Sequence, residues 1–145
     1  MKAFLSIIIL TITMASCQNT ADQASLEKEI FQTEKAFEKM ASEKGIAEAF
    51  YYYAAEDAVI KRENDTLIIG KKNIRTYYEK INDEKTTVSW TPDYINMSAD
   101  GTMAYTYGKY LWKIKDEQGE IAEYKGVFHT VWKKQEDKSW KYVWD

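Results

Sequence analysis

The sequence contains few of the residues that cross-link small domains or bind metals. Its 145 residues include one cysteine, Cys17, and one histidine, His129. A lone cysteine excludes a disulfide within the chain, and a structural zinc site needs about four nitrogen or sulfur ligands. We therefore expect the chain to fold through its hydrophobic core alone, with no metal ion and no cofactor.

An excess of positive charge is also missing. The chain has 20 lysine and arginine residues against 23 aspartate and glutamate residues, a formal net charge of −3. A nucleic-acid-binding surface needs positive charge collected on one face. The basic residues Lys71, Lys72 and Arg75 belong instead to a mixed set of charges that is typical of a solvated surface. We predict no nucleic-acid partner.

The chain has no apolar run long enough to cross a membrane. Residues 3–14 form an uncharged, mostly apolar segment behind Lys2. A helix that spans a bilayer needs about 20 apolar residues, so this segment is too short for a stable anchor. Its length and position are typical of an export signal that is removed from the mature protein.

The segment ends in Met-Ala-Ser-Cys at residues 14–17, which resembles the lipobox of bacterial lipoproteins. In that motif an apolar residue and two small residues precede a cysteine that is lipidated and becomes the new N-terminus. The alternative is an ordinary cleavage site beside an incidental thiol. We predict lipidation of Cys17, because the chain's only cysteine falls at the end of the apolar segment. The lipid would be the chain's only contact with a membrane.

The lipobox resemblance divides the chain into three parts. Residues 1–16 would be the signal peptide, residues 17–24 a lipidated flexible tether, and residues 25–145 a single domain. Lipoproteins of bacteria with two membranes tend to stay at the inner membrane when aspartate follows the cysteine. Gln18 occupies that position, so the same resemblance implies an outer-membrane anchor and a domain that faces the periplasm.

Hydrophobic periodicity places helices in the first half of the domain. Apolar residues at helical spacing predict one helix over residues 25–44 and a shorter one over about residues 46–57. Short β-type runs at residues 58–60 and 67–69 predict a hairpin. A third helix should follow Gly70.

From residue 86 onward the pattern changes to strands. Short polar turns separate four segments rich in β-branched and aromatic residues, so we predict an antiparallel, four-stranded meander. Pro92 should mark a bulge, because proline removes a hydrogen-bond donor from the ladder. Helices followed by strands indicate an α+β domain, with helices covering one face of a curved antiparallel sheet and a pocket between them. The four segments are residues 86–99, 102–115, 120–134 and 139–144.

Six short motifs follow one another in the chain. They are FxxYAxEDAV at 50–59, GKxxIRxY at 70–77, SWxP at 89–92, AYTYG at 104–108, TVWKK at 130–134 and SWK at 139–141. Their succession resembles the SnoaL-like or DUF4440-type branch of the nuclear-transport-factor-2-like superfamily. That superfamily has a cone fold and includes steroid isomerases, dehydratases, epoxide hydrolases, polyketide cyclases and non-catalytic binding modules. The resemblance therefore implies the cone fold without choosing one function.

The resemblance does not carry over the steroid-isomerase mechanism. Those enzymes place a general base five residues after the aspartate that corresponds to Asp57, which is Arg62 here. A guanidinium cannot accept a proton at working pH. The oxyanion-hole tyrosine of the same enzymes falls near Phe37, which has no hydroxyl. We do not expect isomerase activity of that type.

Three other residues are weak catalytic candidates. Asp57 could be a pocket acid, although an aspartate between a helix and a strand more often turns the chain. His129 could be a base if its ring faced the pocket and a carboxylate such as Glu123 oriented it. Strand alternation instead puts Phe128, Thr130 and Trp132 on the inner face and His129 on the outer face.

Aromatic residues make up 14% of the chain and are its most distinctive positive feature. Small-molecule pockets are mostly apolar and aromatic with a few polar tips, which tyrosine and tryptophan provide. The alternative is that these rings fill a β core, where aromatic residues are favoured in any case. The residues predicted to line the pocket are Phe50, Tyr53, Trp90, Tyr107, Trp112, Tyr124, Phe128 and Trp132.

These observations predict a membrane-tethered periplasmic domain that binds a small, partly hydrophobic ligand or a protein partner without catalysis. The alternative is an isomerase, cyclase or dehydratase acting on a small hydrophobic substrate. A homodimer formed through the sheet is compatible with either function.

Overall fold

The computed structural model describes residues 20–81 and 84–145. The predicted signal peptide and Cys17 lie outside the described residues. Within them, helices α1 (Thr20–Lys44), α2 (Ile46–Tyr53) and α3 (Lys71–Tyr78) accompany one mixed sheet. Its strands are β1 (Ala54–Arg62), β2 (Thr66–Ile69), β3 (Thr86–Met97), β4 (Met103–Lys115), β5 (Ile121–Lys134) and β6 (Trp140–Trp144).

Helix α1 begins earlier than the sequence predicts. It starts at Thr20 rather than at Ser25, so the prediction of a flexible tether is wrong for residues 20–24. Solvent-exposed turns of a helix need no apolar stripe, and the stripe used for the prediction begins only at Leu26. The predicted break at Gly45 is confirmed. Gly45 has φ 96°, a backbone conformation that side chains larger than glycine rarely adopt, and it separates α1 from α2.

The sheet is larger than the predicted meander. Strands β3, β4, β5 and β6 pair antiparallel in sequence order, as predicted, and β1 and β2 form the predicted hairpin. Strand β1 also pairs in parallel with β6, which joins the two units into one six-stranded sheet of order β2-β1-β6-β5-β4-β3. The prediction of a separate four-stranded, purely antiparallel sheet is therefore wrong. Sequence periodicity identifies strands but does not show which of their edges meet.

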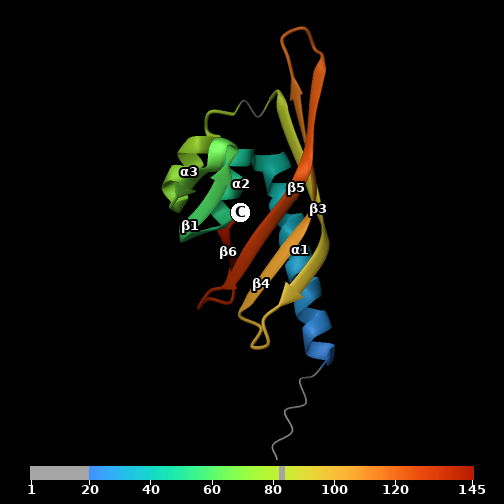
Figure 1. Ribbon diagram of the computed structural model, residues 1–145, viewed down its shortest axis with the longest axis vertical. Coiled ribbons are helices and arrows are strands. Elements are labelled where there is room, and N and C mark those ends of the chain that lie inside the picture. Colours follow the sequence, from blue (N-terminus) through green and yellow to red (C-terminus); the bar gives the residue numbers. More distant parts are fainter. Residues whose placement is uncertain (1–19, 82–83) are drawn as a thin grey trace, which may run out of the picture.

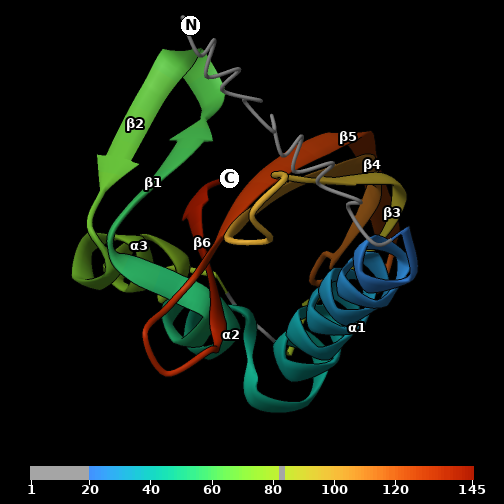
Figure 2. The same ribbon diagram turned by 90° about the horizontal axis from the view of Figure 1, so that it is seen from below.

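The helices lie on the concave side of the sheet. Figure 2 shows the sheet curving around α1 and α2, and Figure 1 shows the β4–β5 hairpin projecting beyond them. The predicted α+β cone architecture, with helices packed on a curved sheet, is confirmed. We call the concave face, which meets the helices, the inner face and the opposite one the outer face.

The bulge predicted at Pro92 is confirmed. The register between β3 and β4 shifts between Pro92 and Tyr94. Opposite the bulge lies Gly108, where a Cβ atom would come within 2.1 Å of the carbonyl oxygen of Thr91. The bulge thus presses β3 onto β4 so closely that only glycine fits.

Gly108→Ala should destabilise the fold more than Gly126→Ala. The methyl group at Gly108 meets backbone atoms, so the strands must move apart, and overpacking of this kind costs up to about 3 kcal/mol. A methyl group at Gly126 meets the Tyr110 ring at 2.5–2.8 Å, and that ring can rotate away. Urea unfolding followed by tryptophan fluorescence measures the free energy of unfolding of both variants. An equal or smaller loss for Gly108→Ala would contradict the close approach at the bulge.

Candidate functional site

Aromatic side chains fill the space where a ligand pocket was predicted, between the helices and the inner face. The ring centroid of Phe37 on α1 lies 4.8 Å from that of Phe50, 4.9 Å from Tyr53 and 4.8 Å from Trp90. Trp132 on β5 is fully buried beside them. Phe50, Tyr53, Trp90 and Trp132, four of the predicted pocket residues, therefore belong to the core, where their rings pack around Phe37.

The other four predicted pocket residues lie apart from these rings. Trp112 and Phe128 are half-buried on the inner face. Tyr124 lies opposite Trp112 in the projecting hairpin and is 57% exposed. Tyr107 lies opposite His129 on the outer face. The prediction of one pocket lined by all eight residues is wrong, because the aromatic character of a residue does not tell which face or layer its ring occupies.

A buried carboxyl group on α1 connects the helix to three strands. Glu34 is completely buried. Its Oε2 accepts a hydrogen bond from Trp90 Nε1 at 2.9 Å, and its Oε1 accepts from Trp132 Nε1 at 2.9 Å and from Thr106 Oγ1 at 2.5 Å. Burial raises the pKa of Glu34, because the charged form loses its water; these three hydrogen bonds act in the opposite direction. The group fixes the packing of the inner face and is closed to solvent.

Exposed apolar side chains gather on the outer face. We call Tyr94, Tyr105, Tyr107, Val127 and His129 the outer patch. Tyr94 lies opposite Tyr107 and Tyr107 opposite His129, so their side chains share one face. The rings of Tyr94 and Tyr107 stack at 5.0 Å, and the ring of His129 lies 5.9 Å from that of Tyr105. Val127 is 71% exposed and Tyr107 is 40% exposed.

Apolar side chains extend from the outer patch across the sheet. Val131 lies opposite Trp144, Trp144 is aligned with Val59, and Val59 lies opposite Ile69. Val131, Trp144 and Val59 are half-buried, whereas Ile69 and Leu67 on β2 are exposed. An apolar band therefore crosses the outer face from β3 to β2, and no described element covers it.

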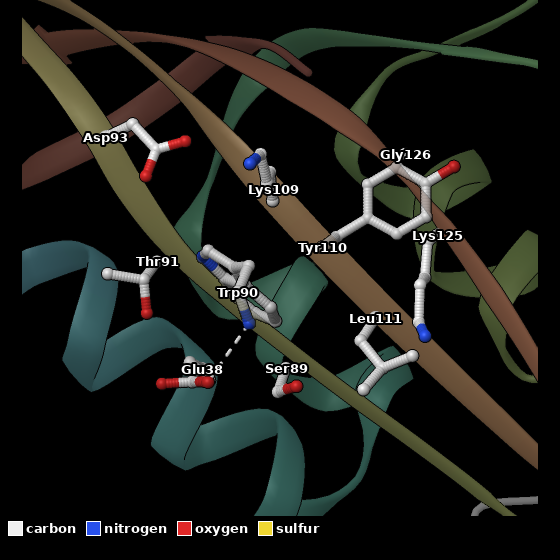
Figure 3. A pocket seen from close by; sticks show the side chains of 10 residues that line it. All are labelled: Glu38, Ser89, Trp90, Thr91, Asp93, Lys109, Tyr110, Leu111, Lys125 and Gly126. Carbon is white, nitrogen blue, oxygen red and sulfur yellow. Dashed lines mark hydrogen bonds between the residues drawn. The ribbon is translucent and has the colours of Figure 1, made fainter.

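A hollow of about 470 Å³ adjoins the outer patch. Figure 3 shows its lining, which includes Asp93 on β3, Lys109 and Leu111 on β4, Lys125 on β5 and Glu38 on α1. The side chains of the three strands here mostly belong to the outer face. A second hollow, of about 340 Å³, lies at the end of α1, between residues 41–45 and 86–88.

Helix α1 also covers part of the free edge of β3. The backbone N–H of Trp90 donates to Glu38 Oε1 at 3.0 Å, and Lys35 Nζ donates to the carbonyl oxygen of Trp90 at 3.2 Å. Pro92, two residues further, has no N–H. This part of the edge is thus closed to another strand.

Two structural features bear on membrane and metal binding. Among residues 20–81 and 84–145, no helix is long and apolar enough to cross a membrane. The same residues contain no group of three or more histidine, cysteine, aspartate or glutamate side chains that could hold a metal ion.

No protein-family model and no curated protein matches this chain. Its backbone is similar to solved structures. An NTF2-like protein with a cystatin-like fold from Novosphingobium aromaticivorans has a TM-score of 0.70 and 15% identity, over 90% of this chain and 88% of that one. The association domain of C. elegans CaMKII has a TM-score of 0.69 and 15% identity, over 85% and 95%. A ketosteroid isomerase-like protein from Erwinia carotovora atroseptica has a TM-score of 0.65 and 12% identity, over 81% and 92%.

The chain has the NTF2-like fold. Arg62, which the sequence resemblance aligns with the steroid-isomerase base, is half-buried at the end of β1. Its Nε donates to the hydroxyl of Tyr78 and its Nη2 to Oδ1 of Asp145, both at 2.8 Å. Asp145 Oδ2 in turn accepts from Thr130 Oγ1 at 3.1 Å, and the guanidinium carbon lies 5.7 Å from the centre of the Phe50 ring.

The Arg62 group keeps its charge in this environment. Burial alone would lower the pKa of Arg62, but Tyr78 and Asp145 raise it on balance. Burial also raises the pKa of Tyr78. The two side chains therefore form a salt-bridged, hydrogen-bonded cluster with Asp145, in which the guanidinium cannot take a proton from a substrate.

The three weak catalytic candidates do not come together in the NTF2-like fold. Asp57 is exposed on β1, and His129 is exposed on the outer face, as strand alternation predicts. Glu123 forms ion pairs with Lys125 at 2.8 Å and Lys113 at 3.2 Å, whose hydrogen bonds lower its pKa. Glu123 and His129 are six residues apart on one strand, about 20 Å, so the carboxylate cannot orient the ring.

The sequence analysis did not predict two polar groups, the buried Glu34 and the cluster of Arg62, Tyr78 and Asp145. Glu34 lies four residues after Ile30 and three before Phe37, in the middle of the apolar stripe of α1. A charged residue at such a position is a signal for a buried, hydrogen-bonded carboxyl group. The cluster of Arg62, Tyr78 and Asp145 had no comparable signal, because its members are far apart in the sequence.

Glu34→Gln should remove part of the pH dependence of stability. Because the pKa of Glu34 in the folded chain is raised above its ordinary value of 4.5, the folded chain binds this proton more tightly than the unfolded chain. The contribution of the group to stability is full below pH 4.5 and is lost as the pH rises through the raised pKa. We expect a smaller decline in the variant, measured by urea unfolding from about pH 4 to about pH 8.

Glu43→Gln is the matched control, since Glu43 is exposed on the same helix and, among the described residues, forms an ion pair with Lys39. It should keep the wild-type slope. Glu34→Ala should lower the free energy of unfolding by about 3 kcal/mol or more, because two indole N–H groups and a hydroxyl lose their acceptor. A wild-type slope in Glu34→Gln would show that burial does not perturb this carboxyl group.

Proposed function

We propose that this chain is a lipid-anchored, non-catalytic association module that binds a second copy of itself through the outer face of its sheet. The observation that carries the proposal is the position of its apolar surface. The inner face, where an NTF2-like fold could hold a ligand, is filled by core aromatic residues. The outer face leaves tyrosine, valine, leucine and isoleucine side chains in water.

The outer face is large enough for a stable dimer. A strand residue covers about 3.3 by 4.8 Å of a sheet face, so the six strands present on the order of 900 Å² on one side. A standard protein interface buries about 800 Å² on each partner. Soluble monomers rarely expose contiguous apolar patches larger than a few hundred Å². The outer face as a whole therefore has the area of a standard interface, and the outer patch is its exposed apolar part.

Association through the sheet face also fits the way the edge of β3 is closed. Lys35 and Glu38 occupy the backbone groups of Trp90, which disfavours strand addition at that point. Face-to-face packing of two sheets needs no free edge. The CaMKII structure, which is similar to this chain, is itself an association domain, and this supports the same use of the fold here.

The anchor part of the proposal rests on the lipobox resemblance. A cysteine behind two small residues ends an uncharged segment too short to span a bilayer. Lipid chains at Cys17 would hold the folded domain at a membrane surface, and Gln18 favours the outer membrane and the periplasm. Tethering raises the local concentration of copies, which promotes their pairing.

Tyr107→Glu should weaken the dimer at least tenfold, because it places a charge within the stacked rings of the outer patch. Native mass spectrometry of the full-length chain released from detergent micelles measures the dimer fraction against concentration. Tyr52→Glu is the matched control, since Tyr52 is exposed on α2, away from the outer face. A wild-type chain that stays monomeric throughout would overturn the proposal.

Cys17→Ser should release the chain from membranes and abolish the uptake of labelled fatty acid. Cell fractionation and metabolic labelling measure the two effects. Ser16→Ala is the control, because it keeps a small residue before the cysteine and should leave anchoring intact. The lipid-anchor prediction is wrong if the serine variant still sediments with membranes and the wild type takes up no label.

A further inference from the structure

Two opposite charges lie unpaired in the hollow beside the outer patch. Asp93 is at the β3 bulge, and Lys109 is on β4, opposite Thr91. Within the described residues, neither side chain has a hydrogen-bond or ion-pair partner. The other charged groups of the hollow do have partners, since Glu38 pairs with Lys35 and Lys125 pairs with Glu123.

The bulge accounts for the separation of the two charges. They stand on neighbouring strands, where opposite charges usually pair across the ladder. The register shifts between Pro92 and Tyr94, so Asp93 is the extra residue of the bulge and has no directly opposite residue on β4. Figure 3 shows both side chains at one end of the hollow, without a contact between them.

Burying these charges in an interface requires partners of opposite sign. A charge that loses water without gaining a partner destabilises the complex strongly. In a two-fold dimer the same surface meets itself, so whatever residue i contacts on the partner contacts residue i in return. A hollow whose unpaired charges are one aspartate and one lysine is complementary to its own copy.

We infer that Asp93 of each copy forms an ion pair with Lys109 of the other, and that this reciprocal pair fixes the register in which the two outer faces meet. The inference rests on the proposed function, because it names the contact that selects one dimer among the possible ones. The apolar outer patch supplies the association, and the charge pair excludes other orientations.

Charge reversal tests the pair in the full-length chain. Asp93→Lys and Lys109→Asp should each weaken the dimer at least tenfold, because every 93–109 contact then joins like charges. The double variant, Asp93→Lys with Lys109→Asp, should recover to within about threefold of the wild type. Native mass spectrometry from detergent micelles, with one variant labelled with nitrogen-15, counts each species.

An equimolar mixture of the two single variants is the decisive sample. In the mixed dimer both 93–109 contacts again join opposite charges, so the heterodimer should exceed the two homodimers together. Repulsion within one chain cannot produce this result, because mixing leaves each chain unchanged. Lys72→Asp and Glu136→Lys, which reverse exposed charges on α3 and in the β5–β6 turn, should leave the dimer as it is.

The outcomes separate the two proposals. If the single variants form dimers like the wild type while Tyr107→Glu does not, the charge pair is wrong and the dimer stands. A statistical mixture of homodimers and heterodimers would also overturn the pair. If the wild type forms no dimer at any concentration, the proposed function and this inference both fail.

Discussion

The buried carboxyl group of Glu34 is the interaction on which the packing of this fold depends. It accepts hydrogen bonds from Trp90, Trp132 and Thr106, and so it joins α1 to β3, β5 and β4 at one point. A hydrogen bond to a buried acceptor is directional, whereas apolar contact is not. The two indole rings are therefore held in place, and the aromatic residues around Phe37 close over the space that a ligand would need.

Because core aromatic residues fill the inner face, the remaining apolar strand residues lie on the outer face. The core buries many of the aromatic rings, among them Phe37, Phe50, Tyr53 and three tryptophans, Trp90, Trp132 and Trp140. The remaining strand residues still include tyrosine, valine and isoleucine side chains, which face water on the opposite side of the same strands. Water disfavours such a surface in proportion to its apolar area. Pairing two sheets removes that area without any change in the fold.

Much of the fold could be predicted from the sequence, because periodicity reports on the solvent exposure of each residue. The strands after residue 86, the break at Gly45 and the bulge at Pro92 follow from local signals. The parallel pairing of β1 with β6 does not, since it depends on two segments more than eighty residues apart, in which Ala54 lies beside Tyr142 and Val59 beside Trp144. The candidate site was predicted less well. Tyr107 and Trp132 are both aromatic strand residues, yet Tyr107 is exposed on the outer face and Trp132 is buried in the core. The residue type is the same in kind; the face of the strand and the tertiary packing decide which ring is buried.

Glu34, which is buried, and Arg62, which is half-buried, both have their polar atoms paired within the chain. Glu34 is neutralised or fully hydrogen-bonded among aromatic rings, whereas Arg62 is paired with Asp145 and capped by the hydroxyl of Tyr78. Each arrangement satisfies its charge with groups of the chain itself, so neither leaves a polar atom that a ligand would have to satisfy. A binding site needs the opposite, polar groups that stay unpaired until the partner arrives. Among the described residues, Asp93 and Lys109 in the hollow beside the outer patch are such groups, and we therefore look for the partner on the outer face; inside the fold, the buried indole N–H of Trp140 also has no hydrogen-bond partner.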